Sequence, residues 1–538
     1  MTSPSSALIK TLANHGVEVI FSLSGNQIMP LYDACIDSDI RIIHTRHEGS
    51  AVYMAEAYAQ MTGKLGVALV TAGPGLLNAV SALYSAARAE VPVLLISGDA
   101  AFALDGRGGF QELDQISVTT PIVKYNSRPN SPAAMINNLC ACIDHALSGT
   151  PGPTHLALAF DMLSSSTDTA PATPSKSPAI GGLDAGDLAT VVAALAEAQR
   201  PVVITGPQSN RTRQPAATKA LETALQMPVI CLESARGLSD SFYGDLGATL
   251  SAADLIVHLG KQADYSTGVH AKGRITPNVP IISVLTPDQP VPNIAHKDNP
   301  ITVMTAPHIP SVMTQLGEAV ATVTSAKASP QWVTQLTADI SRRLPFEETS
   351  LGRHPAGVAD SLQRAIAKEE TAILVADGGE FCQWIQAGCV ANRRLINGPS
   401  GAIGGGIAYA IGCSIANPEA TVFLVMGDGT AGFYFAELNN AVRAGCNIVA
   451  IIGNDHRWNA EVQIQIDTYG ADRVFGCDLD ASADYAAAAA GLGLMGMTVT
   501  AEDDLDAAIG AAINHTGPAL LNVLIDGQPA PKFMPMKL

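Results

Sequence analysis

The sequence has no apolar run that could cross a membrane and no leader-like start. Its apolar stretches, such as TVFLVM (421–426) and NIVAIIG (447–453), are far shorter than the about 20 residues that a membrane helix needs. The first residues, MTSPSSALIK, lack a basic start followed by an apolar block. We therefore expect no membrane partner, no signal peptide and a cytoplasmic protein.

Paired cysteines and excess positive charge are also missing. The nine Cys residues show neither CxxC nor Cys/His metal spacing, so we expect reduced thiols and no zinc site. Lys and Arg number 31 against 49 Asp and Glu, a formal net charge of −18, which argues against nucleic acid as a partner. Hydrophobic residues make up 47% of the 538 residues, enough for large cores in two or three domains.

Two stretches rich in Pro, Ser, Thr and Ala divide the chain. They are residues 164–182 and 324–330, the second followed closely by SRRLPFEETSLGRHP (341–355). Both look too polar and too rich in proline to pack, so we interpret them as linkers. The predicted domains are residues 1–165, 183–325 and 345–538.

Short apolar strands alternate with amphipathic helices in every segment, which is typical of parallel α/β sheets. We therefore predict three doubly wound parallel-sheet domains. The expected strands are 17–23, 41–45, 65–72, 91–98, 201–206, 227–232, 253–260, 280–285, 371–377, 421–427, 447–453 and 518–525. Residues 67–99 and 422–455 repeat one strand–turn–helix–strand pattern, which indicates either duplicated domains or the general likeness of such units.

Acidic residues follow two neighbouring strands of the third segment. Asp428 stands between Gly427 and Gly429, and Asp455 follows the next strand. Ligands of parallel sheets sit at the carboxyl ends of strands, so these oxygen-bearing side chains should meet. With phosphate oxygens they suit Mg²⁺. A Gly-Asp-Gly turn without any ligand is the alternative.

This spacing resembles the thiamine diphosphate (ThDP) enzymes, whose signature is GDG followed about two dozen residues later by Asn-Asn. The resemblance implies that Gly427, Asp428, Gly429 and Thr430 contact the cofactor. It further implies that Asp428, Asp455 and the backbone carbonyl of Arg457 bind Mg²⁺. Asp455 departs from the family's Asn and adds a negative charge beside the diphosphate.

Two further loops of the third segment carry the resemblance. Asp377, Gly378 and Gly379 resemble the loop beside the diphosphate. In NGPSGAIGGGIAYAIG, Ile403 stands where the family has a bulky apolar residue that bends the two rings of ThDP towards each other. Close helix–sheet packing is the alternative explanation for so many glycines.

The first segment resembles the half of the site that holds the aminopyrimidine ring. In RHEGSA, Glu48 corresponds to the glutamate that hydrogen-bonds N1′ and so starts proton removal at C2. The alternatives are a carboxylate that only stabilises a helix N-terminus or a salt bridge to Arg46. His47 is interpreted as structural or pocket-lining.

Two other loops of the first segment match as well. The resemblance implies that Thr71, Gly73 and Pro74 of TAGPG lie near the aminopyrimidine. It also implies that Gln111 of FQE lies near the substrate, which makes Gln111 the second predicted catalytic residue. The resemblance also implies that Glu48 and the metal site meet across a subunit interface, in a homodimer or homotetramer.

The middle segment leaves its ligand open. Relatives hold FAD, ADP or CoA, or nothing, in this domain. ITGPQSNRTRQ is not GxGxxG, and Arg211 and Arg213 suit either phosphate binding or plain solvation.

The resemblance implies a ThDP- and Mg²⁺-dependent carbon–carbon lyase or ligase acting on 2-keto or 2-hydroxy acids or their thioesters. Carboligation of the acetolactate synthase type comes first. Thioester cleavage of the 2-hydroxyacyl-CoA lyase or oxalyl-CoA decarboxylase type comes second. A non-catalytic ThDP-fold binding protein and a nucleotide-dependent oxidoreductase are the other classes considered.

Overall fold

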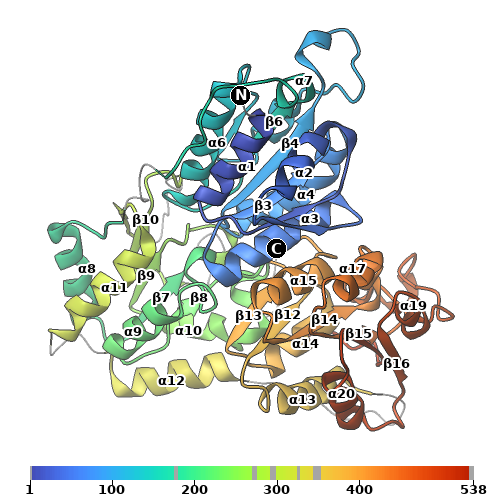
Figure 1. The fold of residues 1–538 in the computed structure, drawn as a ribbon. Helices are drawn as coiled ribbons and strands as arrows, with labels where there is room; N and C mark the ends of the chain where they lie inside the picture. Colours follow the sequence, from blue (N-terminus) through green and yellow to red (C-terminus); the bar gives the residue numbers. More distant parts are fainter. Residues whose placement is uncertain are drawn as a thin grey trace.

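The computed structural model describes residues 3–174, 180–268, 275–290, 299–323, 328–342 and 353–531. Within them the strands form three separate sheets, and neighbouring strands of each sheet run parallel. We call the parts built on these sheets the first, middle and third domains (Figure 1). The predicted fold class, three doubly wound parallel α/β sheets, is confirmed.

The first domain has six strands in the order β2-β1-β3-β4-β6-β5. The strands are β1 (Val19–Ser22), β2 (Arg41–His44), β3 (Gly66–Val70), β4 (Val93–Asp99), β5 (Tyr125–Ser127) and β6 (Thr154–Ala159). The helices are α1 (Pro4–Asn14), α2 (Met29–Ile36), α3 (Glu48–Thr62), α4 (Pro74–Arg88), α5 (Gln115–Thr119), α6 (Pro132–Leu147) and α7 (Phe160–Leu163).

The third domain has the same topology, β13-β12-β14-β15-β17-β16. Its strands are β12 (Ala372–Ala376), β13 (Arg393–Ile396), β14 (Thr421–Gly427), β15 (Ile448–Asn454), β16 (Met495–Val499) and β17 (Ala519–Leu524). Its helices are α13 (Pro355–Ile366), α14 (Glu380–Gly388), α15 (Gly406–Ala416), α16 (Asp428–Ala431), α17 (Leu438–Arg443), α18 (Asn459–Tyr469), α19 (Tyr485–Gly491) and α20 (Leu505–Ile513). The repeated pattern at 67–99 and 422–455 therefore occupies equivalent strands of two like sheets.

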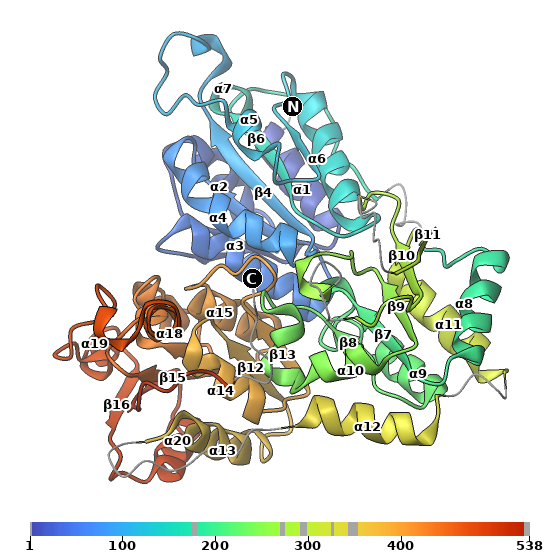
Figure 2. The same cartoon turned by 180° about the vertical axis from the view of Figure 1, so that it is seen from behind.

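The middle domain has five strands in the order β11-β10-β9-β7-β8. They are β7 (Pro201–Thr205), β8 (Ile230–Cys231), β9 (Leu255–Leu259), β10 (Ile281–Leu285) and β11 (Ile301–Thr305). The helices are α8 (Ala185–Glu197), α9 (Pro215–Leu225), α10 (Leu246–Ala252), α11 (Ile309–Ala321) and α12 (Pro330–Ser341). The view from behind shows α12 along the lower edge, beneath the middle domain (Figure 2).

One apolar core joins the first and third domains. Helix α3 packs against both α15 and α4, and buried residues of all three belong to a single cluster. The Tyr409 hydroxyl on α15 donates to a side-chain oxygen of Glu56 on α3 at 2.9 Å and lies 3.1 Å from the Ser85 hydroxyl on α4. The middle domain has a core of its own.

The structure differs from the sequence expectations in two places. In the stretch interpreted as the first linker, Ala172 is hydrogen-bonded on both sides to α1, through Thr11 and Asn14. Past the predicted end of the middle domain, Trp332 and Leu336 of α12 lie in the middle-domain core. Residues 324–327 and 343–352 lie outside the described residues, and the predicted domain boundaries remain predictions.

Candidate active site

The predicted metal ligands lie at one edge of the third sheet. Strands β14 and β15 pair in parallel with Gly427 opposite Gly453, so Asp428 and Asp455 follow at neighbouring strand ends. Both side chains line a cavity of about 250 Å³. The two carboxylates therefore lie at the same edge of the sheet, as their spacing in the sequence predicts.

Asp428 has an unsatisfied oxygen. Its side chain is 2% exposed; Oδ1 accepts the Gly429 N–H at 3.0 Å, whereas Oδ2 is buried without a hydrogen-bond partner among the described residues. Burial raises the pKa of Asp428 to about 6. A buried carboxylate oxygen without a donor is costly unless a cation or a proton meets it.

Asp455 supplies the second negative group. Burial, and then the charge of Asp428, raise the pKa of Asp455 to about 7, which shows that the two carboxylates repel each other. A divalent cation relieves both the repulsion and the unsatisfied oxygen, so these residues fit Mg²⁺. Among the described residues no group of three or more His, Cys, Asp or Glu could hold a metal, so the remaining ligands must be carbonyl, phosphate or water oxygens.

The two glycines that flank Asp428 have different roles. A Cβ on Gly429 would lie 2.6 Å from the Trp458 ring, so this glycine is required by side-chain packing. A Cβ on Gly427 would meet only the Thr430 hydroxyl, at 4.0 Å, which leaves that side open to a ligand. Arg457 and Thr430 also line the cavity.

Asp377 organises the glycine-rich loop from inside. It is 1% exposed, and its carboxylate accepts the N–H groups of Gly378, Gly404 and Gly406 at 2.6, 3.0 and 2.9 Å. Gly378, Gly379 and Ile403 line the cavity, but Asp377 does not. A Cβ on Gly378 would lie 2.5 Å from Ile403 Cγ2, so Ile403 packs directly on this loop.

Glu48 is the first residue of α3 and is 8% exposed. One carboxylate oxygen accepts the Asn78 side-chain N–H at 3.0 Å. The alternative salt bridge is not seen among the described residues, because Arg46 donates instead to Asn439 at 2.6 Å.

His47 and Glu437 hold the Glu48 loop in place. His47 Nδ1 caps α3 by accepting the Gly49 N–H at 3.0 Å, which agrees with the structural role expected for this histidine. Glu437, which is 1% exposed, accepts the backbone N–H groups of Arg46 and His47 at 2.9 and 3.0 Å. The third domain therefore fixes the loop that carries Glu48.

Gln111 packs on the turn that follows β3. Gly73 has φ +55°, and a Cβ there would lie 2.9 Å from the Gln111 carbonyl oxygen. Gln111 has φ +59°, rare for a residue with a side chain, and its Oε1 is buried without a partner among the described residues. Pro74 begins α4, and Thr71 donates to the Gln27 side chain at 2.6 Å.

The predicted site residues thus form two groups in one chain. Glu48, Gln111, Thr71, Gly73 and Pro74 gather in the first domain. The cavity with Asp428 and Asp455 is lined, among the described residues, only from the third domain and by Ser234, Ala235 and Arg236 of the middle domain. One chain therefore presents two half-sites.

A side chain of the first domain fills the carboxyl edge of the middle sheet. Ligands of such sheets lie where the strand order reverses, here between β7 and β9. The Glu90 carboxylate occupies this point and accepts from the Gln208 backbone N–H at 3.2 Å and the Gln289 side chain at 3.3 Å. A carboxylate at this point does not suit a nucleotide phosphate.

The two arginines considered for phosphate binding are engaged by the chain itself. Arg213 donates to the carbonyls of Ala89 and Glu90 at 3.1 and 2.8 Å. Arg211 forms an ion pair with Glu222. Interpreting Arg213 as merely solvated is therefore wrong.

Sequence reasoning missed three residues of the site. Glu437 and Asn78 act through tertiary contacts, and Trp458 through its packing on Gly429. Glu437 and Trp458 lie close to the GDG and GND motifs in sequence, the one signal that could have drawn attention to them. No helix of the described chain is both long enough and apolar enough to span a bilayer.

Comparison with known proteins places this geometry in a family. Residues 3–118 match the N-terminal TPP binding domain of thiamine pyrophosphate enzymes, and residues 377–523 match the C-terminal TPP binding domain. The 2-hydroxyacyl-CoA lyase 2 proteins of Bos taurus and Homo sapiens are each 30% identical, with 92% of this chain and 84% of the relative aligned. An acetolactate synthase large subunit of Mycobacterium tuberculosis is 28% identical over 96% of this chain and 95% of its own.

Proposed function

Because this chain belongs to the thiamine pyrophosphate enzyme family, we propose that it forms or cleaves a carbon–carbon bond next to a carbonyl of a 2-keto or 2-hydroxy acid or its thioester, using ThDP and Mg²⁺. The observation that carries this proposal is the Asp428–Asp455 pair, with its unsatisfied buried oxygen at the edge of the third sheet.

The third domain binds the cofactor's charged end. Asp428, Asp455 and the Arg457 carbonyl would hold Mg²⁺, and Gly427, which has open space beside it in the cavity, would leave room for the diphosphate. Ile403, which packs on Gly378, would support the cofactor rings. Bound ThDP supplies an electron sink for the bond that breaks or forms.

The first domain handles the proton. Glu48 would hold a hydrogen bond at N1′ of the aminopyrimidine when the cofactor is bound, and could exchange a proton there. Asn78 orients the Glu48 carboxylate, and the Glu437 contacts hold its loop in place. Gln111, whose buried Oε1 has no partner among the described residues, would contact the substrate.

We place the complete site at the interface of a homodimer. This rests on the two half-sites of a single chain, because the cavity of one protomer lacks a catalytic carboxylate that Glu48 of a second protomer can supply. Exposed apolar side chains beside both half-sites suit such an interface: Leu77 and Tyr84 on α4, and Phe433 next to α16.

Carboligation of 2-keto acids, as in the acetolactate synthases, is the first reaction that we propose. Thioester cleavage is the second candidate, favoured by the 30% identity to proteins named 2-hydroxyacyl-CoA lyase 2. We also propose a cytoplasmic location, which the nine free cysteines suit.

The deciding experiment combines cofactor analysis with two assays. Mass spectrometry of small molecules released from the purified protein identifies what it retains. Pyruvate consumption with acetolactate formation supports carboligation, whereas aldehyde release from a 2-hydroxyacyl-CoA supports the lyase. ThDP binding without turnover of either substrate class would indicate a binding protein and overturn the catalytic proposal.

Glu48→Gln separates chemistry from binding. The amide keeps the shape of the side chain but cannot cycle a proton at N1′, so we expect turnover to fall by at least about a hundredfold. ThDP affinity, measured by calorimetry with Mg²⁺ present, should stay close to wild type. Wild-type turnover in this variant would show that the assigned mechanism is wrong.

A further inference from the structure

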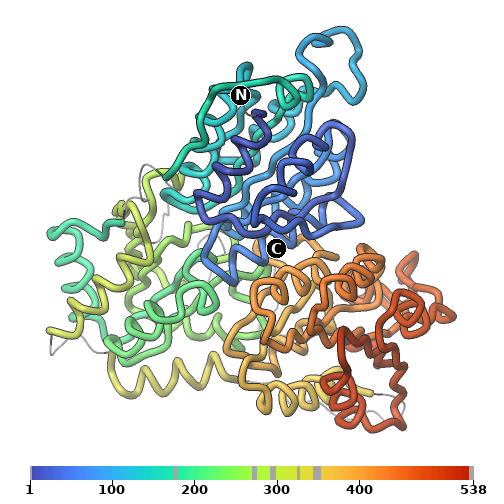
Figure 3. Tube along the Cα trace, viewed as in Figure 1, coloured from blue at the N-terminus to red at the C-terminus, as the bar shows by residue number. Residues whose placement is uncertain are grey.

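The loop between β4 and α5, residues 100–114, projects from the first domain and away from the other two (Figure 3). Its side chains Leu104 and Phe110 are 45% and 73% exposed. Gly106 and Gly108 have φ of +70° and +72°, conformations that glycine adopts freely. A loop of this kind holds one shape only if side chains fix it.

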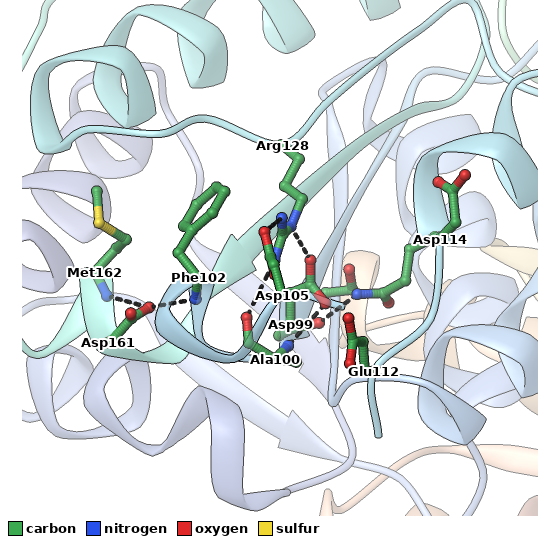
Figure 4. Close-up of polar contacts among 12 residues, drawn as sticks. Asp99, Ala100, Phe102, Asp105, Glu112, Asp114, Arg128, Asp161 and Met162 are labelled. Atoms are coloured by element: carbon green, nitrogen blue, oxygen red, sulfur yellow. Dashed lines mark hydrogen bonds and ion pairs between the residues drawn. The ribbon is translucent and has the colours of Figure 1, made fainter. Parts of the chain in front are cut away.

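Arg128, just past β5, fixes the near end of the loop (Figure 4). Its guanidinium pairs with Asp99 at the end of β4 and donates twice to Asp105 within the loop, at 2.8 Å each. It also donates to the Ala100 carbonyl at 3.3 Å and lies 4.0 Å from the centre of the Phe102 ring. One side chain therefore contacts three residues of the loop and one residue of the sheet.

Two more carboxylates hold the 100–114 loop in place. Asp161, on α7, accepts the N–H groups of Phe102 and Ala103 at 3.1 and 3.3 Å. Glu112 accepts those of Gly106 and Gly109 at 2.6 and 2.8 Å and so closes the far part of the loop on itself. The residue directly before Glu112 is Gln111.

The fixed loop ends in the first half-site. Gln111, in its strained backbone conformation, packs on Gly73. A Cβ on Gly75, two residues further, would lie 3.5 Å from a Glu48 carboxylate oxygen. The loop's position therefore decides where the Gln111 side chain lies relative to Glu48.

We propose that Arg128 is a positioning residue for Gln111: through Asp99 and Asp105 it holds the 100–114 loop so that Gln111 meets the substrate in the assembled site. This rests on the proposed function, in which Gln111 contacts the substrate. A bidentate arginine suits the task because its planar, rigid donors fix direction as well as distance.

The main variant is Asp105→Ala. Asp105 is 42% exposed, so its loss loosens the loop at Arg128 while the Arg128 pair with buried Asp99 remains and the protein still folds. Asp506→Ala is the matched control, because Asp506 is 48% exposed and accepts two hydrogen bonds from Arg364, at 2.9 Å each. Arg128→Lys is the conservative variant.

The first readout is independent of activity. Trypsin should cut after Arg107, which is exposed in the loop, about ten times faster in Asp105→Ala than in wild type. Arg128→Lys should be intermediate, because lysine cannot make the paired contacts. Asp506→Ala should match wild type. Equal cleavage rates in all four proteins would overturn the proposal.

The second readout tests positioning. With the substrate that wild type turns over, kcat/KM should fall about tenfold in Asp105→Ala, with ThDP affinity unchanged. In a Gln111→Ala background the same change should cost less than about twofold, because there is no longer a side chain to position. An undiminished loss in that background would contradict the proposal.

The two proposals fail in different ways. A wild-type protein that turns over neither substrate class contradicts the proposed function. It also removes the substrate contact assigned to Gln111, so the positioning role falls with it. Wild-type turnover together with unchanged cleavage and kcat/KM in Asp105→Ala contradicts only the role of Arg128.

Discussion

Asp455 puts a second carboxylate beside Asp428 where the resemblance leads one to expect an amide. The charge of Asp428 contributes to the raised pKa of Asp455, so the two groups lie near enough to repel. Two anions attract a divalent cation more strongly than one does, but they also repel a diphosphate. The charge at position 455 should therefore strengthen Mg²⁺ binding and weaken ThDP binding.

Asp455→Asn tests this opposition. We expect weaker Mg²⁺ binding without cofactor and tighter ThDP binding at saturating Mg²⁺, each changed by several-fold, because one charge is removed and an oxygen ligand is kept. Titration calorimetry measures both. Asp478→Asn, a nearby carboxylate that is 76% exposed, is the control and should change neither. A loss of affinity for both ligands would contradict the argument.

The sequence predicts residue positions best where spacing along the chain can be combined with the pairing of parallel strands. Asp428 and Asp455 could be paired in advance, because parallel strands bring their carboxyl ends to one edge. Glu437 and Asn78 could not be identified in the same way. A glutamate before a helix and an asparagine within one are common in sequences, and only the fold brings these two side chains to the Glu48 loop. Cofactor contact by Asp377 stays a prediction, and the structure shows its carboxylate hydrogen-bonded inside the glycine-rich loop.

Among elements, edge strands were the hardest to predict. Twelve strands were expected, and four of the five missed, β5, β11, β13 and β16, are the outer strands of their sheets. Edge strands bury less surface and so carry weaker apolar patterns: β5 is Tyr-Asn-Ser, and β13 begins with two arginines. The inner strand β6 was hidden by His155, whose ring is hydrogen-bonded within the core to Ser97 and Thr119.

The contact between α3 and α15 depends on a glycine. A Cβ on Gly412 would lie 2.5 Å from the Met54 carbonyl oxygen and 2.8 Å from Ala57 Cβ. Gly412→Ala should therefore push the helices apart and lower the free energy of unfolding by about 1–3 kcal/mol, as measured by urea denaturation. Because Glu48 begins α3, activity should fall as well.

Gly510, within α20, provides the control for this substitution. A Cβ there would meet nothing within 4 Å. Gly510→Ala should raise stability by about 0.5–1 kcal/mol, since alanine loses less conformational entropy in a helix. Equal effects of the two substitutions would show that the α3–α15 spacing is not tight.

The same contact makes stability depend on pH. Burial raises the pKa of Glu56 from its ordinary 4.5 to about 8. Between these values the folded protein keeps a proton that the unfolded chain has lost, so stability falls as pH rises, by at most about 1.4 kcal/mol per unit. Glu56→Gln should remove this slope. Urea denaturation from pH 5 to 8 measures it, and parallel curves for the two proteins would refute the assignment.

At the scale of the whole molecule, the proposed function makes catalysis depend on assembly of two chains. The first domain holds Glu48 and the third holds the Asp428–Asp455 pair, and the described lining of the cavity includes no residue of the first domain. Under the proposed dimer, each site takes one half from each protomer.

Mixing two inactive variants tests that arrangement. Glu48→Gln and Asp428→Ala damage different halves, so a mixed dimer has one doubly damaged site and one intact site. Random reassociation makes half of the dimers mixed, and activity should recover to about a quarter of wild type. Each variant unfolded and refolded alone is the control. No recovery in verified mixed dimers would place both halves of a site in one protomer.

The identical strand order of the first and third sheets has a consequence for how the work is divided. The turn after the third strand carries Thr71 to Pro74 in one domain and Gly427 to Thr430 in the other, and each turn opens a helix. Under the proposed function, two sheets of one topology would hold opposite ends of one small molecule. One would supply a proton-transferring carboxylate and the other the ligands of a metal ion, while a single buried core joins them.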